Sequence, residues 1–190
     1  MTLRSKLLSS AAILGMASLP AVAFAADNAN VNASITTSAG ITAANVANIG
    51  FGNWLVGIAS GDTPTITLGP TSGGFTTGAL GTSQLINLDG DTAGTIGQVT
   101  VTLPAGADGV VLQMTRSAIT NFSDGGLALT AVSYDTDDIA PAVLAQATPV
   151  DVTVESGGVA EPVTFGATIT ADATPADATH SASFNVSFSY

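Results

Sequence analysis

The chain has 190 residues, no cysteine, and three basic residues against fourteen acidic ones, so its formal net charge is −11. Without cysteine the protein has no disulfide bonds, no thiolate metal ligands and no cysteine nucleophile. The scarcity of Lys and Arg excludes the phosphate neutralisation on which nucleic-acid binding depends, and it disfavours anionic membrane surfaces. We therefore expect no nucleic-acid partner.

The N-terminus has the three regions of a secretory signal peptide in the right order. Arg4 and Lys6 supply positive charge, an apolar run follows over residues 7–19, and Ala23-Phe24-Ala25 is the small-x-small pattern that signal peptidase cleaves after. The apolar run is about a dozen residues long, short of the ~20 that a membrane-spanning helix needs. We predict that residues 1–25 are a signal peptide and that the protein is secreted.

Cleavage after Ala25, with Ala23 or Ala26 as alternative sites, leaves one predicted domain over residues 26–190. Two of the three basic residues leave with the signal peptide, so Arg116 faces all fourteen acids and the formal charge becomes 1 − 14 = −13. Only 9% of the chain is charged, so Thr, Ser, Asn and Gly must cover most of the surface. A large net charge then keeps copies of such a protein apart.

From residue 29 onward, apolar and polar side chains alternate with the period of a strand that has one buried face. The first such stretch places Ala29, Val31, Ala33 and Ile35 on one face, and the last runs over residues 182–190. Gly- and Pro-containing turns separate the runs between them. These runs predict an all-β antiparallel sandwich with strands over residues 65–68, 99–103, 110–114, 127–132, 150–154 and 163–171.

Two other segments carry structural predictions. Trp54 lies in the apolar segment 49–56, where it is either a binding anchor or a core aromatic. We favour the core, because Phe51 and Leu55 flank it and few other large side chains are available to fill a sandwich. Residues 139–146 are predicted to form one short turn of helix.

The densest acidic cluster consists of Asp135, Asp137 and Asp138, and the segment Asp89-Gly90-Asp91 is a second one. Clustered loop carboxylates suit Ca²⁺, which takes six to eight oxygen ligands. Neither stretch has EF-hand spacing or the nonapeptide repeat of calcium-binding β-rolls, so solvated turns are the competing interpretation. Asp135, Asp137 and Asp138 are the candidate metal ligands, and no other cofactor is expected.

The sequence has no recognisable catalytic apparatus, and we do not expect an enzyme. His180 is the sole histidine, and a Ser-His-Asp arrangement needs a nucleophile and an orienting acid beside it. No Gly-x-Ser-x-Gly motif occurs, so His180 is predicted to be a loop or strand-edge residue. An aspartate-pair glycosidase would want aromatic platforms for sugar rings, and Trp54, Tyr134 and Tyr190 are the only Trp and Tyr residues.

Three segments together carry a family resemblance. They are Ile-Gly-Phe-Gly at 49–52, Gly-Gln-Val-Thr-Val-Thr-Leu-Pro at 97–104, and Phe-Gly-Ala-Thr-Ile at 165–169 followed by a Pro-containing turn and the terminal strand. In this order and spacing, residues 31–190 resemble the bacterial secreted family catalogued as domain of unknown function 4402. That family has no assigned activity and is similar to fimbrial subunits of the chaperone–usher type.

The resemblance implies an incomplete immunoglobulin-like sandwich that a neighbour's N-terminal strand completes. It also implies related subunits and a periplasmic chaperone as partners, and transit through the periplasm to the surface of a Gram-negative cell. Residues 26–38 fit a donor strand, with Val31, Ala33 and Ile35 filling the groove and Ser38-Ala39-Gly40 as its hinge.

Two alternatives stay open. Ala29 and Ala33 fill a groove poorly, so residues 26–38 are equally well interpreted as an edge strand of their own sheet. The alternative function is a monomeric secreted binding module that depends on Ca²⁺ at the Asp135–Asp138 cluster.

Overall fold

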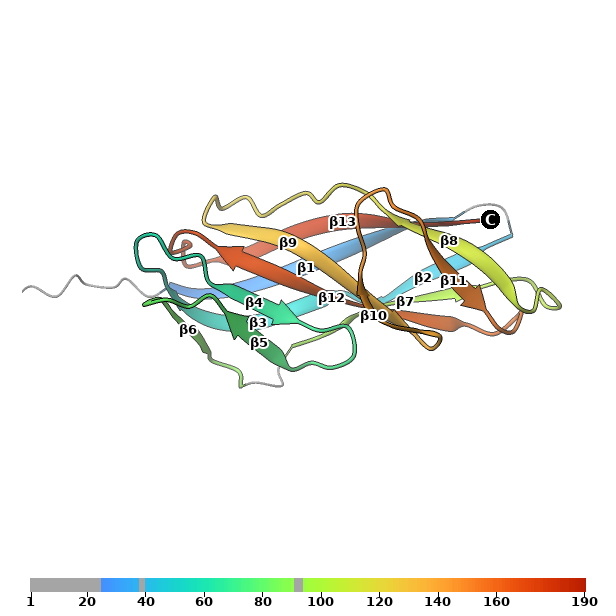
Figure 1. Ribbon diagram of the computed structural model, residues 1–190, viewed down its shortest axis with the longest axis horizontal. Coiled ribbons are helices and arrows are strands. Elements are labelled where there is room, and N and C mark those ends of the chain that lie inside the picture. Colours follow the sequence, from blue (N-terminus) through green and yellow to red (C-terminus); the bar gives the residue numbers. More distant parts are fainter. Residues whose placement is uncertain (1–24, 38–39, 91–93) are drawn as a thin grey trace, which may run out of the picture.

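The computed structural model describes residues 25–37, 40–90 and 94–190. Of the predicted signal peptide, only Ala25 is among the described residues. Ser38 and Ala39 of the predicted hinge, and Asp91, also lie outside them. Over the described residues the chain contains no helix and forms thirteen strands in two facing sheets, a sandwich-like all-β architecture (Figure 1). This part of the chain accordingly has no helix long and apolar enough to cross a membrane.

Six strands form sheet 1 and seven form sheet 2. Sheet 1 has the order β11-β8-β13-β1-β3-β6 and contains β1 (Ala25–Thr37), β3 (Ile49–Gly57), β6 (Gln84–Asn87), β8 (Val110–Arg116), β11 (Val150–Val154) and β13 (Thr179–Ser189). In sheet 2 the order is β10-β9-β12-β4-β5, with β7 also paired to β12 and β2 to β7. Its strands are β2 (Thr42–Ala47), β4 (Thr65–Leu68), β5 (Phe75–Gly78), β7 (Gly97–Thr102), β9 (Leu127–Thr136), β10 (Ile139–Val143) and β12 (Glu161–Ala171).

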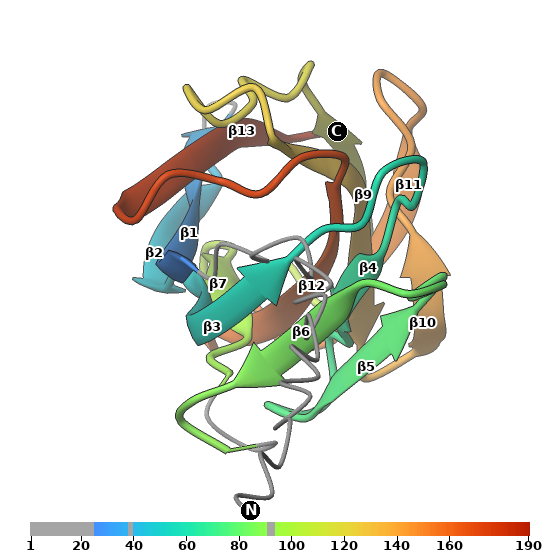
Figure 2. The same cartoon turned by 90° about the vertical axis from the view of Figure 1, so that its left-hand side faces the viewer.

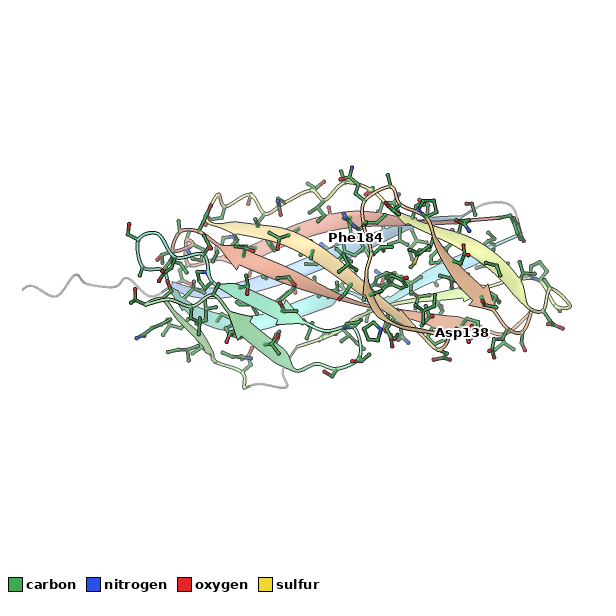
Figure 3. All side chains as sticks on the ribbon, in the orientation of Figure 1. Asp138 and Phe184 are labelled. Carbon is green, nitrogen blue, oxygen red and sulfur yellow. The ribbon has the colours of Figure 1, made fainter. Side chains whose placement is uncertain are left out.

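The core lies between the sheets and follows from the predicted alternation. On β13, Ala182, Phe184, Val186 and Phe188 are buried, whereas the intervening residues are half-buried. Phe184 (labelled in Figure 3) meets Phe165 of β12 edge to face at 6.2 Å between ring centroids, so the contact joins the two sheets. Burial of such aromatic and β-branched side chains is the main favourable term in folding a cysteine-free chain.

Trp54 is a core aromatic, as predicted. It is buried on β3, its Nε1 donates to the Phe51 carbonyl at 2.6 Å, and its ring packs edge to face on Phe75. The polar end of the indole is therefore satisfied inside the protein, as a buried Trp requires.

The predicted helical turn at residues 139–146 is wrong, because this stretch forms β10 in a hairpin with β9. A helical segment this short is marginal on its own, and Pro141 inside it lacks the N–H that a helix interior uses. Pairing with the edge of β9 supplies hydrogen bonds instead. The antiparallel prediction also fails at one place, since β1 runs parallel to β13.

Gly166 on β12 marks a close approach between chain segments. A Cβ placed there would lie 2.2 Å from the Leu68 carbonyl oxygen and 2.7 Å from the Pro70 nitrogen. Both atoms belong to the backbone, so they cannot swing aside as a flexible side chain does.

We therefore expect Gly166→Ala to lower the free energy of unfolding by about 1–3 kcal/mol, the range for overpacking. Gly125→Ala is the matched control, because nothing lies within 4 Å of a Cβ at that position, and it should change stability by less than ~0.5 kcal/mol. Urea denaturation of the three proteins measures the difference. Equal midpoints for both variants would contradict the close approach.

Candidate functional site

The N-terminal strand β1 lies inside sheet 1, between β3 and the C-terminal strand β13 (Figures 1 and 2). It pairs with β13 in parallel from Asn28↔Thr179 to Thr37↔Phe188. It pairs with β3 antiparallel from Ala25↔Val56 to Val31↔Ile49. Among the described residues no ladder joins β3 directly to β13, so β1 fills a groove one strand wide, which we call the β3–β13 groove.

The side chains of β1 alternate as the sequence predicted. Val31 is fully buried and Ala29 nearly so, whereas Ala33 and Ile35 are half-buried against the core. Asn32 is exposed. Within its own chain β1 therefore turns Ala29, Val31, Ala33 and Ile35 inward, and Val31 is the most deeply buried of them. The role of Val31, Ala33 and Ile35 in a donor strand stays a prediction.

A small apolar cavity lies beneath Ala29. Its volume is about 20 Å³, and its lining has no polar surface; it is bounded by Ala29, Phe51, Trp54, Val56, Ile66, Leu127 and Ile169. This is on the order of the space that one water molecule needs, but water also needs polar partners, so a site lined in this way stays dry. Ala29 is the residue of β1 that lines this cavity.

Beyond Val31, β1 loses its pairing with β3, because the chain preceding β3 belongs to β2 in the other sheet. Asn45 of β2 makes the contact there, donating from Nδ2 to the Ala33 carbonyl at 3.4 Å and to Asn48 Oδ1 at 2.8 Å. Among the described residues, the second half of β1 is thus held by the β13 ladder and by the long Asn45 side-chain hydrogen bond, whereas the first half pairs with a strand on both sides.

His180 begins the other wall of the groove, opposite Ala29 in the β1–β13 register. It was predicted to be a loop or strand-edge residue, and the structure instead buries it at 4% exposure. Its Nε2 lies 3.0 Å from the Ala176 carbonyl, so this nitrogen carries a proton and donates. Asp124 Oδ2 is 3.9 Å away. The arrangement joins the loop before β13 to the loop before β9.

Aspartates tie together loops that are distant in sequence. Asp62 accepts from the backbone N–H of Thr82 at 2.7 Å and of Ser83 at 3.0 Å. Asp124 accepts from the N–H of Ala176 at 2.8 Å and of Gly126 at 2.9 Å. These bonds stabilise the ionised carboxylates, as hydrogen bonding to a charged form does.

Two pKa values fall for this reason. The Thr82 N–H, followed by the Ser83 hydroxyl, lowers the pKa of Asp62 below its usual range. The Ala176 N–H, followed by that of Gly126, lowers the pKa of Asp124, and nearby His180 adds a smaller effect. Asp89 and Asp108 also accept backbone hydrogen bonds, from Asn53 and Gly157 respectively.

The three candidate metal ligands do not converge. Asp135 is half-buried on β9 opposite Thr164, whereas Asp137 and Asp138 are exposed in the turn between β9 and β10 (Figure 3 labels Asp138). Within residues 25–37, 40–90 and 94–190, no three His, Asp or Glu side chains are grouped so that they could hold a metal ion. Calcium binding stays a prediction.

Arg116, the only Lys or Arg after the predicted cleavage site, is buried at the end of β8. Its Nε donates to the Leu144 carbonyl and its Nη1 to the Ser117 carbonyl, each at 2.9 Å. Burial lowers its pKa. Sequence analysis assigned this residue no role, and its contacts show that it fastens the chain after β10 to β8.

No protein-family model matches the chain, and no curated protein is significantly similar to it.

The aspartate contacts predict a loss of stability in acid. A carboxyl whose pKa is lower in the folded state stabilises the fold above the unfolded pKa of about 3.9, and this stability is lost as pH falls through the folded pKa. We therefore expect the melting temperature to fall on acidification below about pH 4. Asp62→Asn and Asp124→Asn should melt lower at pH 7 and show a shallower acid dependence.

Asp138→Asn is the control, because it changes the same net charge in an exposed turn. Its melting temperature should follow that of the unmodified protein across the acid range. If the melting temperature of Asp62→Asn falls in acid as steeply as that of the unmodified protein, the hydrogen bonds to the Asp62 carboxylate do not contribute to the acid dependence of stability.

Proposed function

We propose that this chain is a secreted structural or adhesive surface subunit that assembles by strand complementation. The observation that carries the proposal is the position of β1, an N-terminal strand that fills the β3–β13 groove. In this proposal the sandwich is an immunoglobulin-like fold that lacks one strand, and β1 occupies the position of that strand within its own chain. In an assembly, the equivalent strand of another subunit occupies it.

Several features support β1 as an exchangeable strand. It is connected to the rest of the domain at its C-terminal end alone once the predicted signal peptide is removed. Its inward-facing side chains include Ala29 and Ala33, so leaving the groove exposes less apolar area than a strand of large residues would. The second half of β1 pairs with β13 but not with β3, so the separation of β1 from the groove can begin in that half.

The direction of the incoming strand follows from the residues of β1. Within its own chain β1 runs parallel to β13. Consider a strand from a second copy that runs antiparallel to β13 and keeps Asn32 at the same place. In this reversed strand Ile35 takes the position that Ala29 has in the single chain, and Val31 and Ala33 change places. Such a strand adds apolar atoms where the cavity lies. It pairs antiparallel with β13 and parallel with β3, the reverse of the two pairings that β1 makes within its own chain.

The partners in this proposal are copies of this chain or related subunits. A periplasmic chaperone is a further partner, one that would supply a temporary strand to the groove. The assembled subunits would stand on the surface of a Gram-negative cell, where a domain with a formal charge of −13 resists non-specific association. Strand exchange adds a specific contact with backbone hydrogen bonds on two sides.

A truncation with added peptide tests this function. Residues 38–190 alone should fold but melt at a lower temperature, because removal of Val31 empties an apolar site and the edges of β3 and β13 lose their partner. A synthetic peptide of residues 26–37 should raise the melting temperature again, measured by circular dichroism. The same peptide with Val31→Asp should fail, whereas Asn32→Asp should succeed because Asn32 is exposed. A truncated chain that is equally stable and ignores the peptide would contradict the proposal.

A disulfide lock provides the matched experiment on the mature chain. Asn32 and Ser183 are partners in the β1–β13 ladder, and a protein without other cysteines allows Asn32→Cys and Ser183→Cys to be oxidised cleanly. The locked chain should not polymerise under conditions in which the reduced chain does. If oxidised and reduced forms behave identically by light scattering, assembly does not proceed through β1.

A further inference from the structure

Strand β6 ends sheet 1 on the side of β3 opposite to β1. It pairs with β3 in an uninterrupted register from Trp54↔Asn87 to Gly57↔Gln84. Its other edge makes no backbone ladder with any described residue. An edge of this kind presents free N–H and C=O groups that can pair with another chain.

Three of the four other edge strands of the described residues carry features that discourage such pairing. β10 contains Pro141 and follows two exposed aspartates, and β11 contains Asp151. β2 has a bulge between Asn45 and Ala47. Proline, charge and bulges are devices that block edge-to-edge association. β5 has none of them, but its central residues are exposed threonines.

β6 has no proline, charge or bulge, and its outer face carries an exposed isoleucine, Ile86, beside the exposed polar residue Gln84. Ile86 is 46% exposed, and Leu88, two residues along, is 53% exposed. Ile86 is also the cross-strand partner of Leu55 on β3. The backbone N–H of Leu88 donates to the Asn53 carbonyl at 2.9 Å, which continues the strand direction past Asn87.

The acids at the two ends of β6 are directed toward their own chain. Asp62, near the start of the strand, accepts the N–H groups of Thr82 and Ser83. Asp89, just after the strand, accepts from the Asn53 N–H at 2.7 Å and from Asn53 Nδ2 at 3.1 Å. Neither carboxylate therefore lies along the free edge as a guarding charge of the kind that edge strands use.

We propose that the free edge of β6 binds a second copy of this chain, with the two β6 strands antiparallel about a two-fold axis. The two-fold axis in that arrangement passes beside Ile86, which makes this residue its own cross-strand partner. Two strands that continue one sheet keep their outer faces on the same side, so Ile86 meets Ile86 of the partner copy, and Leu88 lies opposite Gln84. Aliphatic cross-strand pairs of this kind stabilise sheets, and a two-fold contact closes without forming fibres.

This contact is independent of the strand exchange proposed above. β6 lies on one side of β3 and β1 on the other, so one molecule can use both. The contact brings together two domains that each carry a formal charge of −13. Association should therefore strengthen as salt screens the repulsion.

The absence of cysteine makes a direct test available. In the mature chain, Ile86→Cys places a thiol on the proposed axis, where facing Cβ atoms are about 4.5–5.5 Å apart, close enough for a disulfide after small adjustment. Under mild oxidation in 0.5 M NaCl we expect a covalent dimer on non-reducing gels. Val143→Cys is the control, because Val143 is more exposed, at 68%, but lies on the guarded edge strand β10.

Sedimentation velocity of the chain locked by the oxidised Asn32→Cys and Ser183→Cys pair, in which β1 cannot exchange, provides the second measurement. This chain should dimerise more strongly at 0.5 M than at 0.05 M NaCl, and adding Ile86→Lys should leave it monomeric at both. Equal crosslinking of the Ile86→Cys and Val143→Cys variants, or a dimer that survives Ile86→Lys, would overturn the proposal. A mature chain that is monomeric at millimolar concentration in high salt would also overturn it.

Discussion

Sheet 1 depends on one constraint, which is that the facing edges of β3 and β13 must both find backbone hydrogen-bond partners. Buried N–H and C=O groups that lack partners are costly, and β1 satisfies both edges at once. It also buries Val31 completely. Half of the sheet, β11-β8-β13, is connected to the other half, β3-β6, through this strand. Because the chain has no cysteine, no covalent crosslink compensates when β1 is withdrawn.

The same lack of disulfides explains how the loops are held. Four aspartates each accept at least one hydrogen bond from a backbone N–H that lies 20 or more residues away in the sequence. They are Asp62, Asp89, Asp108 and Asp124. Charge-assisted bonds to backbone groups are stronger than neutral ones, and they need no oxidant. The acidic composition is therefore partly structural. Arg116 performs the corresponding task with the opposite charge by donating to two carbonyl groups.

Alternation in the sequence predicted the strands with strong period-two patterns, because burial of one face and that pattern have the same cause. It identified β4 and β11 with their boundaries, the inward residues of β13, and Trp54 as core. It did not predict β5 and β6, because neither Phe-Thr-Thr-Gly at 75–78 nor Gln-Leu-Ile-Asn at 84–87 alternates between apolar and polar residues. The parallel direction of β1, the burial of His180 and the aspartate contacts depend on residues far apart in sequence, which local patterns do not encode. Residues 139–143 form a strand because pairing with β9 outweighs a weak local preference for helix.

The account requires that β1 can leave the groove while the rest of the sandwich stays folded. Native-state hydrogen exchange measures this directly, because amides that open in partial unfolding exchange at a lower free energy than those that require global unfolding. The amides of Asn32 to Ile35 should exchange through a partial opening of low denaturant dependence. Those of β12, which is paired on both sides, should exchange only with global unfolding. If β1 and β12 exchange at the same free energy with the same denaturant dependence, β1 is a fixed part of the sandwich and strand exchange is contradicted.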